Sequence, residues 1–226
     1  MILSVHLADI GTRRAAGVLR STPRPGDVPG LRCATTTITA PLSASLLPRP
    51  TLGRVGLIAA WDDDAALEQF LASHPLAERL AGGWHVRLQP LRTFGTWSAL
   101  PDLPNTEQPI DNTEPVAILT LGRLRLHRTA AFLKASARAE AQAINDPALL
   151  ASTGLARPPA LVATFSLWKT ATAMRAYADG TSGEHHLNAL RTHASRPFHH
   201  ESVFARFRPY ASHGTWNRGD PLQRSS

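Results

Sequence analysis

The chain has 226 residues, of which 43% are hydrophobic and 18% charged, a composition typical of a globular protein that can bury a sizeable core. No run of 18 or more apolar residues is present, which argues against a transmembrane helix. The formal net charge is +7, but most basic residues are scattered arginines, so the sequence favours a solvated basic surface over a nucleic-acid-binding one.

Cysteine usage and the first residues indicate a compartment. Cys33 is the single cysteine, so no disulfide can form within the chain, which suits a reducing cytosol. Residues 1–11 alternate like a strand and have no basic region ahead of their apolar residues, which argues against a signal peptide. We therefore expect a cytoplasmic protein.

The first half of the chain alternates strand and helix patterns. The carboxylates of Asp62, Asp63 and Asp64 predict a helix start that runs to Leu71, because acidic side chains cap and stabilise helix N-termini. The other elements that we predict, in chain order, are a strand over 2–8, a helix over 12–21, strands over 31–41 and 53–60, a helical turn over 75–82 and a strand over 84–93.

Residues 101–115 are rich in proline and polar residues without an apolar period, which predicts a linker. The second half is expected to repeat the plan of the first. The elements that we place in it are a strand over 116–126, a helix over 127–144, a strand over 160–167, helices over 170–178 and 184–194, and a strand over 202–210.

One segment occurs twice, over 53–97 and 159–216. In each copy an apolar run ends in a tryptophan, an alanine-rich stretch follows, and a second apolar run reaches Gly-Thr-Trp. The spacing is 36 positions from Trp61 to Trp97 but 48 from Trp168 to Trp216. The excess of 12 lies around a histidine-rich segment, so we expect the cavity and the functional site in the second half.

These patterns predict an α+β fold of two fused ferredoxin-like repeats, βαββαβ each. Each four-stranded sheet would have one face covered by helices and one bare. Packing the two bare faces together would close a dimeric-α/β-barrel-like domain with a cavity between the sheets. The expected division is a first half over 1–100, the linker over 101–115 and a second half over 116–226.

Several strings carry a family resemblance: ATFSLW (163–168), GEHHLNALRTHA (183–194) and FARFRPYASHGTW (204–216), with GRVGLIAAWDD (53–63) and LAERLAGGWHVRL (76–88) in the first half. They resemble the spheroidene monooxygenase family. The resemblance covers most of the chain, weakly before Gly53 and through the linker. It implies an oxygenase or related oxidoreductase that binds haem b in its second half and uses dioxygen or a peroxide. The substrate implied is a small apolar or biosynthetic-pathway molecule, and no residue specifies a carotenoid.

The resemblance implies that His186 is the iron ligand, since the matching region of the family has a histidine followed by a similar helix. Glu184 is the nearest carboxylate in sequence that could orient the imidazole. His185 is the alternative ligand if the alignment is shifted by one residue. If His186 does not bind iron, it is a solvent-exposed loop histidine at a helix N-terminus. His193 would share a helix face with His186, either as a second pocket residue or in packing.

Arg208 and Trp168 complete the predicted cofactor-binding residues. Arg206 and Arg208 alternate with Phe207, so both arginines share one face of the last strand. Facing into a barrel, they would pair with haem propionates; facing solvent, they would be surface charges. Trp168 either lines the cavity or anchors the core.

Motifs for other cofactors are absent from the sequence: it contains no GxGxxG after a strand, no P-loop, no HExxH and no cysteine-zinc spacing. The alternatives to a haem enzyme are a cofactor-independent barrel oxygenase and a non-catalytic protein that binds haem or another small ligand. The sequence leaves the oligomeric state open.

Overall fold

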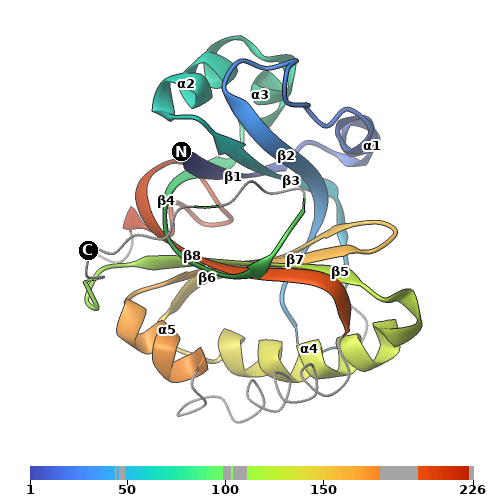
Figure 1. The fold of residues 1–226 in the computed structure, drawn as a ribbon, viewed down its shortest axis with the longest axis vertical. Helices are drawn as coiled ribbons and strands as arrows, with labels where there is room; N and C mark the ends of the chain where they lie inside the picture. Colours follow the sequence, from blue (N-terminus) through green and yellow to red (C-terminus); the bar gives the residue numbers. More distant parts are fainter. Residues whose placement is uncertain (44, 46–48, 99–102, 104–110, 179–197, 224–226) are drawn as a thin grey trace.

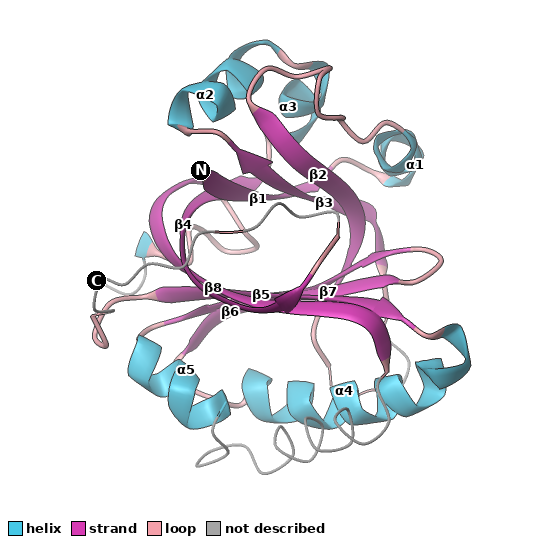
Figure 2. Cartoon of the chain, viewed as in Figure 1, coloured by secondary structure: helices cyan, strands magenta, loops and turns pink. Residues whose placement is uncertain are grey.

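The computed structural model describes residues 1–43, 45, 49–98, 103, 111–178 and 198–223 (Figure 1). Eight antiparallel strands close into one barrel, and the described helices lie outside it in two groups on opposite sides (Figure 2). The predicted α+β class and the closed barrel are therefore confirmed.

Seven elements form the first half, all close to the predicted bounds. Their starts follow from local chemistry: the carboxylate of Asp63 accepts a hydrogen bond from the backbone N–H of Ala66, and Pro75 occupies the first turn of the next helix. The elements are β1 (Ile2–Asp9), α1 (Thr12–Arg20), β2 (Leu31–Ala40), β3 (Thr51–Trp61), α2 (Asp64–Ser73), α3 (Pro75–Leu80) and β4 (Trp84–Thr96).

The second half contains one strand, β6, that the predicted elements left out. Its sequence, LLASTGLAR, includes two alanines and a glycine, which have low strand propensity. Eight of its residues pair with residues of the next strand, β7, and this pairing holds it in the sheet. The predicted helix over 184–194 lies outside the described residues. The elements are β5 (Val116–Leu124), the short 3-10 helix η1 (Leu126–Arg128), α4 (Thr129–Ile144), β6 (Leu149–Arg157), β7 (Leu161–Trp168), α5 (Ala171–Ala178) and β8 (His199–Gly214).

The strand order is the same in both halves. It is β4-β1-β3-β2 in the first and β8-β5-β7-β6 in the second, the order of a ferredoxin-like unit. Two seams join the halves. The β4–β8 seam is paired along nearly the whole of β4, whereas β2 and β6 pair only from Ile38 to Ala40. The barrel wall is therefore weakly paired at the second seam.

The barrel interior is a packed core. Inward-facing residues of seven strands form one continuous apolar cluster, which includes Trp84, Phe165 and Phe207, and the partly buried Cys33 of β2 packs against it. Two further clusters lie outside the barrel, between its wall and the helices. The described side chains fill the middle of the barrel, which in an eight-stranded barrel is just wide enough for them, so the predicted cavity between the sheets does not run through it.

The repeated Gly-Thr-Trp strings mark the two ends of the β4–β8 seam. Gly95 and Gly214 have positive φ angles of 87° and 85°. A Cβ on Gly214 would lie 2.0 Å from the backbone oxygen of Gly83, and one on Gly95 would lie 2.3 Å from that of Ser202. Glycine is required at both positions, since any side chain would collide with the neighbouring strand.

Candidate functional site at the mouth of the barrel

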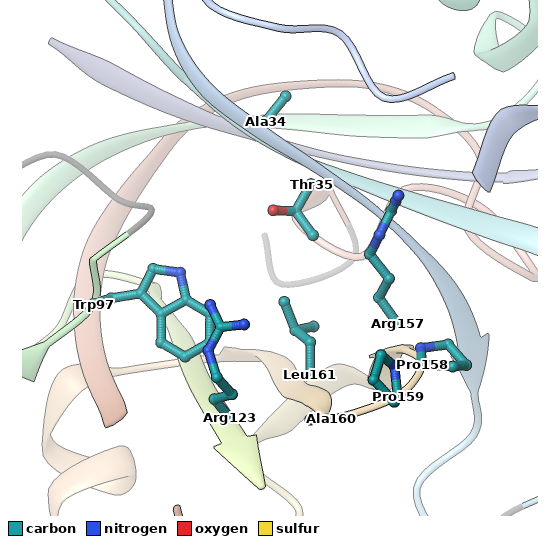
Figure 3. A pocket seen from close by; sticks show the side chains of 9 residues that line it. All are labelled: Ala34, Thr35, Trp97, Arg123, Arg157, Pro158, Pro159, Ala160 and Leu161. Carbon is teal, nitrogen blue, oxygen red and sulfur yellow. The ribbon is translucent and has the colours of Figure 1, made fainter. Parts of the chain in front are cut away.

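A cavity of about 310 Å³ opens at one end of the barrel, where β2 and the β6–β7 hairpin separate (Figure 3). We call it the mouth pocket. Both halves of the chain contribute to it, so the described pocket is not confined to the second half as we expected. Its lining residues are Ala34, Thr35, Trp97, Arg123, Arg157, Pro158, Pro159, Ala160 and Leu161.

Arg157 forms one wall of the mouth pocket at the weakly paired seam. Its Nη1 donates to the Thr22 hydroxyl at 2.7 Å, to the backbone oxygen of Thr36 at 3.0 Å and to the Thr36 hydroxyl. These contacts tie the end of β6 to β2 beyond the last pair of the ladder. The half-buried guanidinium thus has only neutral partners among the described residues.

Trp97 and Arg123 form the opposite wall. The Arg123 guanidinium lies 5.3 Å from the centroid of the Trp97 ring, within cation–π range. Its Nε donates to Glu201 at 2.7 Å, and Glu201 also accepts the backbone N–H of Ser98 at 2.8 Å. The Ser98 N–H and the Arg123 guanidinium lower the pKa of Glu201, so this carboxylate is ionised and holds Arg123 over the indole.

The described residues of the mouth pocket are suited to binding a ligand. The pocket's described lining residues supply two cations, one threonine hydroxyl and apolar groups, and none of them is acidic. None of them is a histidine, cysteine, methionine or tyrosine, the residues that ligate haem iron. The described pocket can therefore hold a ligand but supplies no axial ligand of its own.

The predicted site residues are not brought together in the described structure. His185, His186 and His193 lie outside the described residues. Arg208 lies on the outer face of β8, where its Nε donates to Glu114 at 2.9 Å. It points outward because Phe207 points into the barrel and side chains alternate along a strand. The cavity-facing orientation considered for Arg208 is therefore not observed.

Trp168 also lies outside the barrel. Leu167 points inward, so Trp168 packs beneath α5, with its ring centroid 5.0 Å from that of Tyr177. Its Nε1 donates to the hydroxyl of Ser166 at 3.0 Å. It lines neither the barrel interior nor the mouth pocket.

The residues that line the mouth pocket were missed by the sequence patterns. Arg123 and Arg157 lie at or near strand ends, and neither belongs to a motif. Trp97 was noted only as part of the repeat. No signal in the sequence links these three positions, because closure of the whole barrel brings the end of β4, β5 and the end of β6 to one opening.

A second cluster, the histidine ladder, crosses the outer face of β1, β4 and β8. His6, His85 and His213 stack with ring centroids 5.0 and 5.2 Å apart, and exposure rises from the buried His6 to the exposed His213. The Nε2 of His6 lies 3.0 Å from the hydroxyl of Ser4. Among the described residues no group of three or more His, Cys, Asp or Glu is arranged to hold a metal ion.

The environment of the histidine ladder favours neutral rings. Burial, followed by repulsion from His85 and Arg87, lowers the pKa of His6 from 6.5 to about 3. Burial, with repulsion from His213 and Arg87, lowers that of His85 from 6.5 to about 4. Both rings are therefore neutral at physiological pH.

We expect the histidine ladder to make stability depend on pH. Below about pH 6.5 unfolded histidines bind protons that folded His6 and His85 do not bind. The stability contributed by the two neutral rings is therefore complete above that pH and is lost as the pH falls through 4 towards 3. Urea unfolding at pH 7 and pH 5 should show a smaller loss for His6→Gln than for the unchanged chain. His127→Gln, at an exposed position, is the control, and an unaltered loss in His6→Gln would contradict the assignment.

Solved structures with a similar fold include two aldoxime dehydratases. One, in complex with butyraldoxime, superposes with a TM-score of 0.57 at 10% identity, covering 99% of this chain and 84% of that chain. The other gives 0.55 at 10% identity, covering 98% and 86%. At this identity the likeness shows a shared fold alone.

Curated relatives give the family. No family profile matches the chain. A spheroidene monooxygenase of Rhodobacter capsulatus is 30% identical over 181 residues, 77% of this chain and 74% of the relative. One of Rubrivivax gelatinosus is 30% identical over 173 residues, 74% of this chain and 65% of the relative. The chain therefore belongs to the spheroidene monooxygenase family.

Proposed function

We propose that this protein is a monooxygenase or related oxidoreductase that transfers one oxygen atom from dioxygen or a peroxide to a small apolar or biosynthetic-pathway substrate. The observation that carries the proposal is the 30% identity to the Rhodobacter capsulatus spheroidene monooxygenase across about three quarters of both chains. Spheroidene, named by these relatives, is the first substrate to test. The barrel would position the substrate, and the family assignment supports an oxidoreductase.

We propose haem b as the cofactor, with His186 as iron ligand and His185 as the alternative one residue away. The described residues limit the choice of ligand. Burial raises the pKa of Cys33 to about 11, which disfavours the thiolate that a cysteine ligand requires. None of the described residues that line the mouth pocket can ligate haem iron. The proposal therefore rests on the histidine-rich segment and on the family, and haem would supply the oxidising power.

The test is optical and chemical. Protein produced with ample iron and haem precursor is expected to show a Soret band, one iron per chain and a histidine-type ferrous carbonyl spectrum. With spheroidene, labelled dioxygen and a reductant, mass spectrometry should find one labelled oxygen atom in the product.

Three outcomes separate the alternatives. Oxygen incorporation by a colourless protein that gains no Soret band on haem addition would indicate a cofactor-independent oxygenase. A Soret band without oxygen transfer to spheroidene or to other apolar substrates would indicate a non-catalytic haem-binding protein. The absence of both would contradict the proposal.

We also propose that the two halves, 1–100 and 116–226 around the linker 101–115, are fused ferredoxin-like repeats. The common strand order supports this. So does the equivalence of Trp61 and Trp168, each the last residue of the third strand of its half. No helix among the described residues has the length and apolarity to cross a bilayer. Cytoplasmic location remains our proposal.

A further inference from the structure

We propose that the mouth pocket is a binding site for an organic oxyanion, a carboxylate or a phosphate carried on a small apolar body. The observation is that two arginines line it and that none of its described lining residues is acidic. This site is independent of the proposed redox chemistry, since neither arginine needs a cofactor in order to bind an anion.

Arg157 lines the pocket and keeps two guanidinium nitrogens without a described partner. All three of its hydrogen bonds to described residues use Nη1, so Nε and Nη2 make none within the described part of the chain. The N–H groups of Nε and Nη2 lie side by side and form the fork that pairs with two oxygens of a carboxylate or phosphate. A half-buried cation with neutral partners also gains more from an anion than an exposed one does.

Arg123 supplies a second cation across the mouth pocket. Its only described carboxylate partner, Glu201, occupies Nε and does not line the pocket, which leaves both terminal nitrogens of the guanidinium available. Glu201 and the Trp97 ring fix the side chain, so little rotamer entropy remains to be lost on binding.

Thr35 and the apolar walls define the rest of the ligand. Figure 3 shows Thr35 and Leu161 between the Trp97–Arg123 pair and Arg157, with the Thr35 hydroxyl directed towards the Trp97 side. That hydroxyl makes no hydrogen bond to the described residues and can donate to the oxyanion. The indole of Trp97 and the prolines Pro158 and Pro159 offer flat apolar surfaces. A volume of about 310 Å³ suits a small, flat molecule.

The experiment is isothermal titration calorimetry of the full chain with three probes of one shape: benzoate, phenyl phosphate and benzyl alcohol. At least one anion is expected to bind about tenfold or more tightly than the neutral alcohol, as charge-assisted hydrogen bonds require. The tighter anion identifies the headgroup. Equal binding of all three probes, or no binding of either anion, would overturn the proposal.

Four variants locate the site. Arg157→Met should weaken binding of the preferred anion about tenfold and Arg123→Met several-fold, while Thr35→Val should cost about threefold. Arg32→Met, which removes an exposed arginine on the same strand as Thr35, should leave affinity unchanged. Arg157→Met also loses the contacts that hold the seam. If Arg157→Met fails to fold, Arg123→Met and Thr35→Val serve as the test. Wild-type affinity for the anion in both of these variants would exclude the mouth pocket as its binding site.

Discussion

His186→Ala is expected to abolish tight haem binding while the barrel stays folded. The physical reason is that all eight strands and the three described core clusters are built from residues outside 179–197. Loss of an axial imidazole removes the bond that anchors the iron. The variant should lose the Soret band on gel filtration of the haem-loaded protein, and its urea unfolding midpoint without haem should match that of the unchanged chain.

The informative comparison is a set of alanine variants titrated with haem side by side. His193→Ala should keep haem, and a role in orienting the ligand would reduce activity by about 10- to 100-fold. His213→Ala should also keep haem, because His213 lies on the outer end of the histidine ladder. Loss of haem in His185→Ala alone would mean that the alignment is shifted by one residue. Wild-type spectra in all four would contradict a ligand in this segment, and His127 would be tested next.

The fold could be predicted to a large extent because its determinants are local. Period-2 and period-3.6 apolar patterns, the Asp63 cap and Pro75 fix the element types and most of the bounds. β6 was missed because its alanines, serine and glycine give no strand signal, and its pairing with β7 and β2 specifies it instead. The packed interior was missed for a different reason. An apolar period shows which face is buried, whereas the space left inside depends on the side chains that meet there, since an eight-stranded barrel can be filled by them or can hold one small ligand.

The candidate sites depend on register, which no local pattern encodes. His6 and His85 stack because the β1–β4 register sets them opposite each other, and the β4–β8 register adds His213. The mouth pocket depends on the short β2–β6 ladder, which ends where Arg157 reaches Thr36. A shift of one residue at either seam would turn these side chains to the other face of the wall.

Phe165→Ala is expected to lower the free energy of unfolding by about 3–5 kcal/mol, the usual cost of deleting a fully buried aromatic ring. Phe165 is 0% exposed at the centre of the barrel, with its ring centroid 6.2 Å from those of both Trp84 and Trp216. The eight strands surround this ring, so the wall cannot collapse into the cavity that its removal leaves. Urea denaturation, followed by the fluorescence of the neighbouring tryptophans, measures the change.

Phe94→Ala is the matched control, because Phe94 is 57% exposed on the outside of the barrel and should change stability by less than about 1 kcal/mol. The unfolding slope should be the same in both variants, which would attribute the difference to the folded core. The new cavity in Phe165→Ala would be apolar and closed, so it should stay dry and bind benzene. Equal stability of the two variants would mean that the interior is loosely filled. In that case the barrel interior, and not the mouth pocket alone, would have space for a substrate.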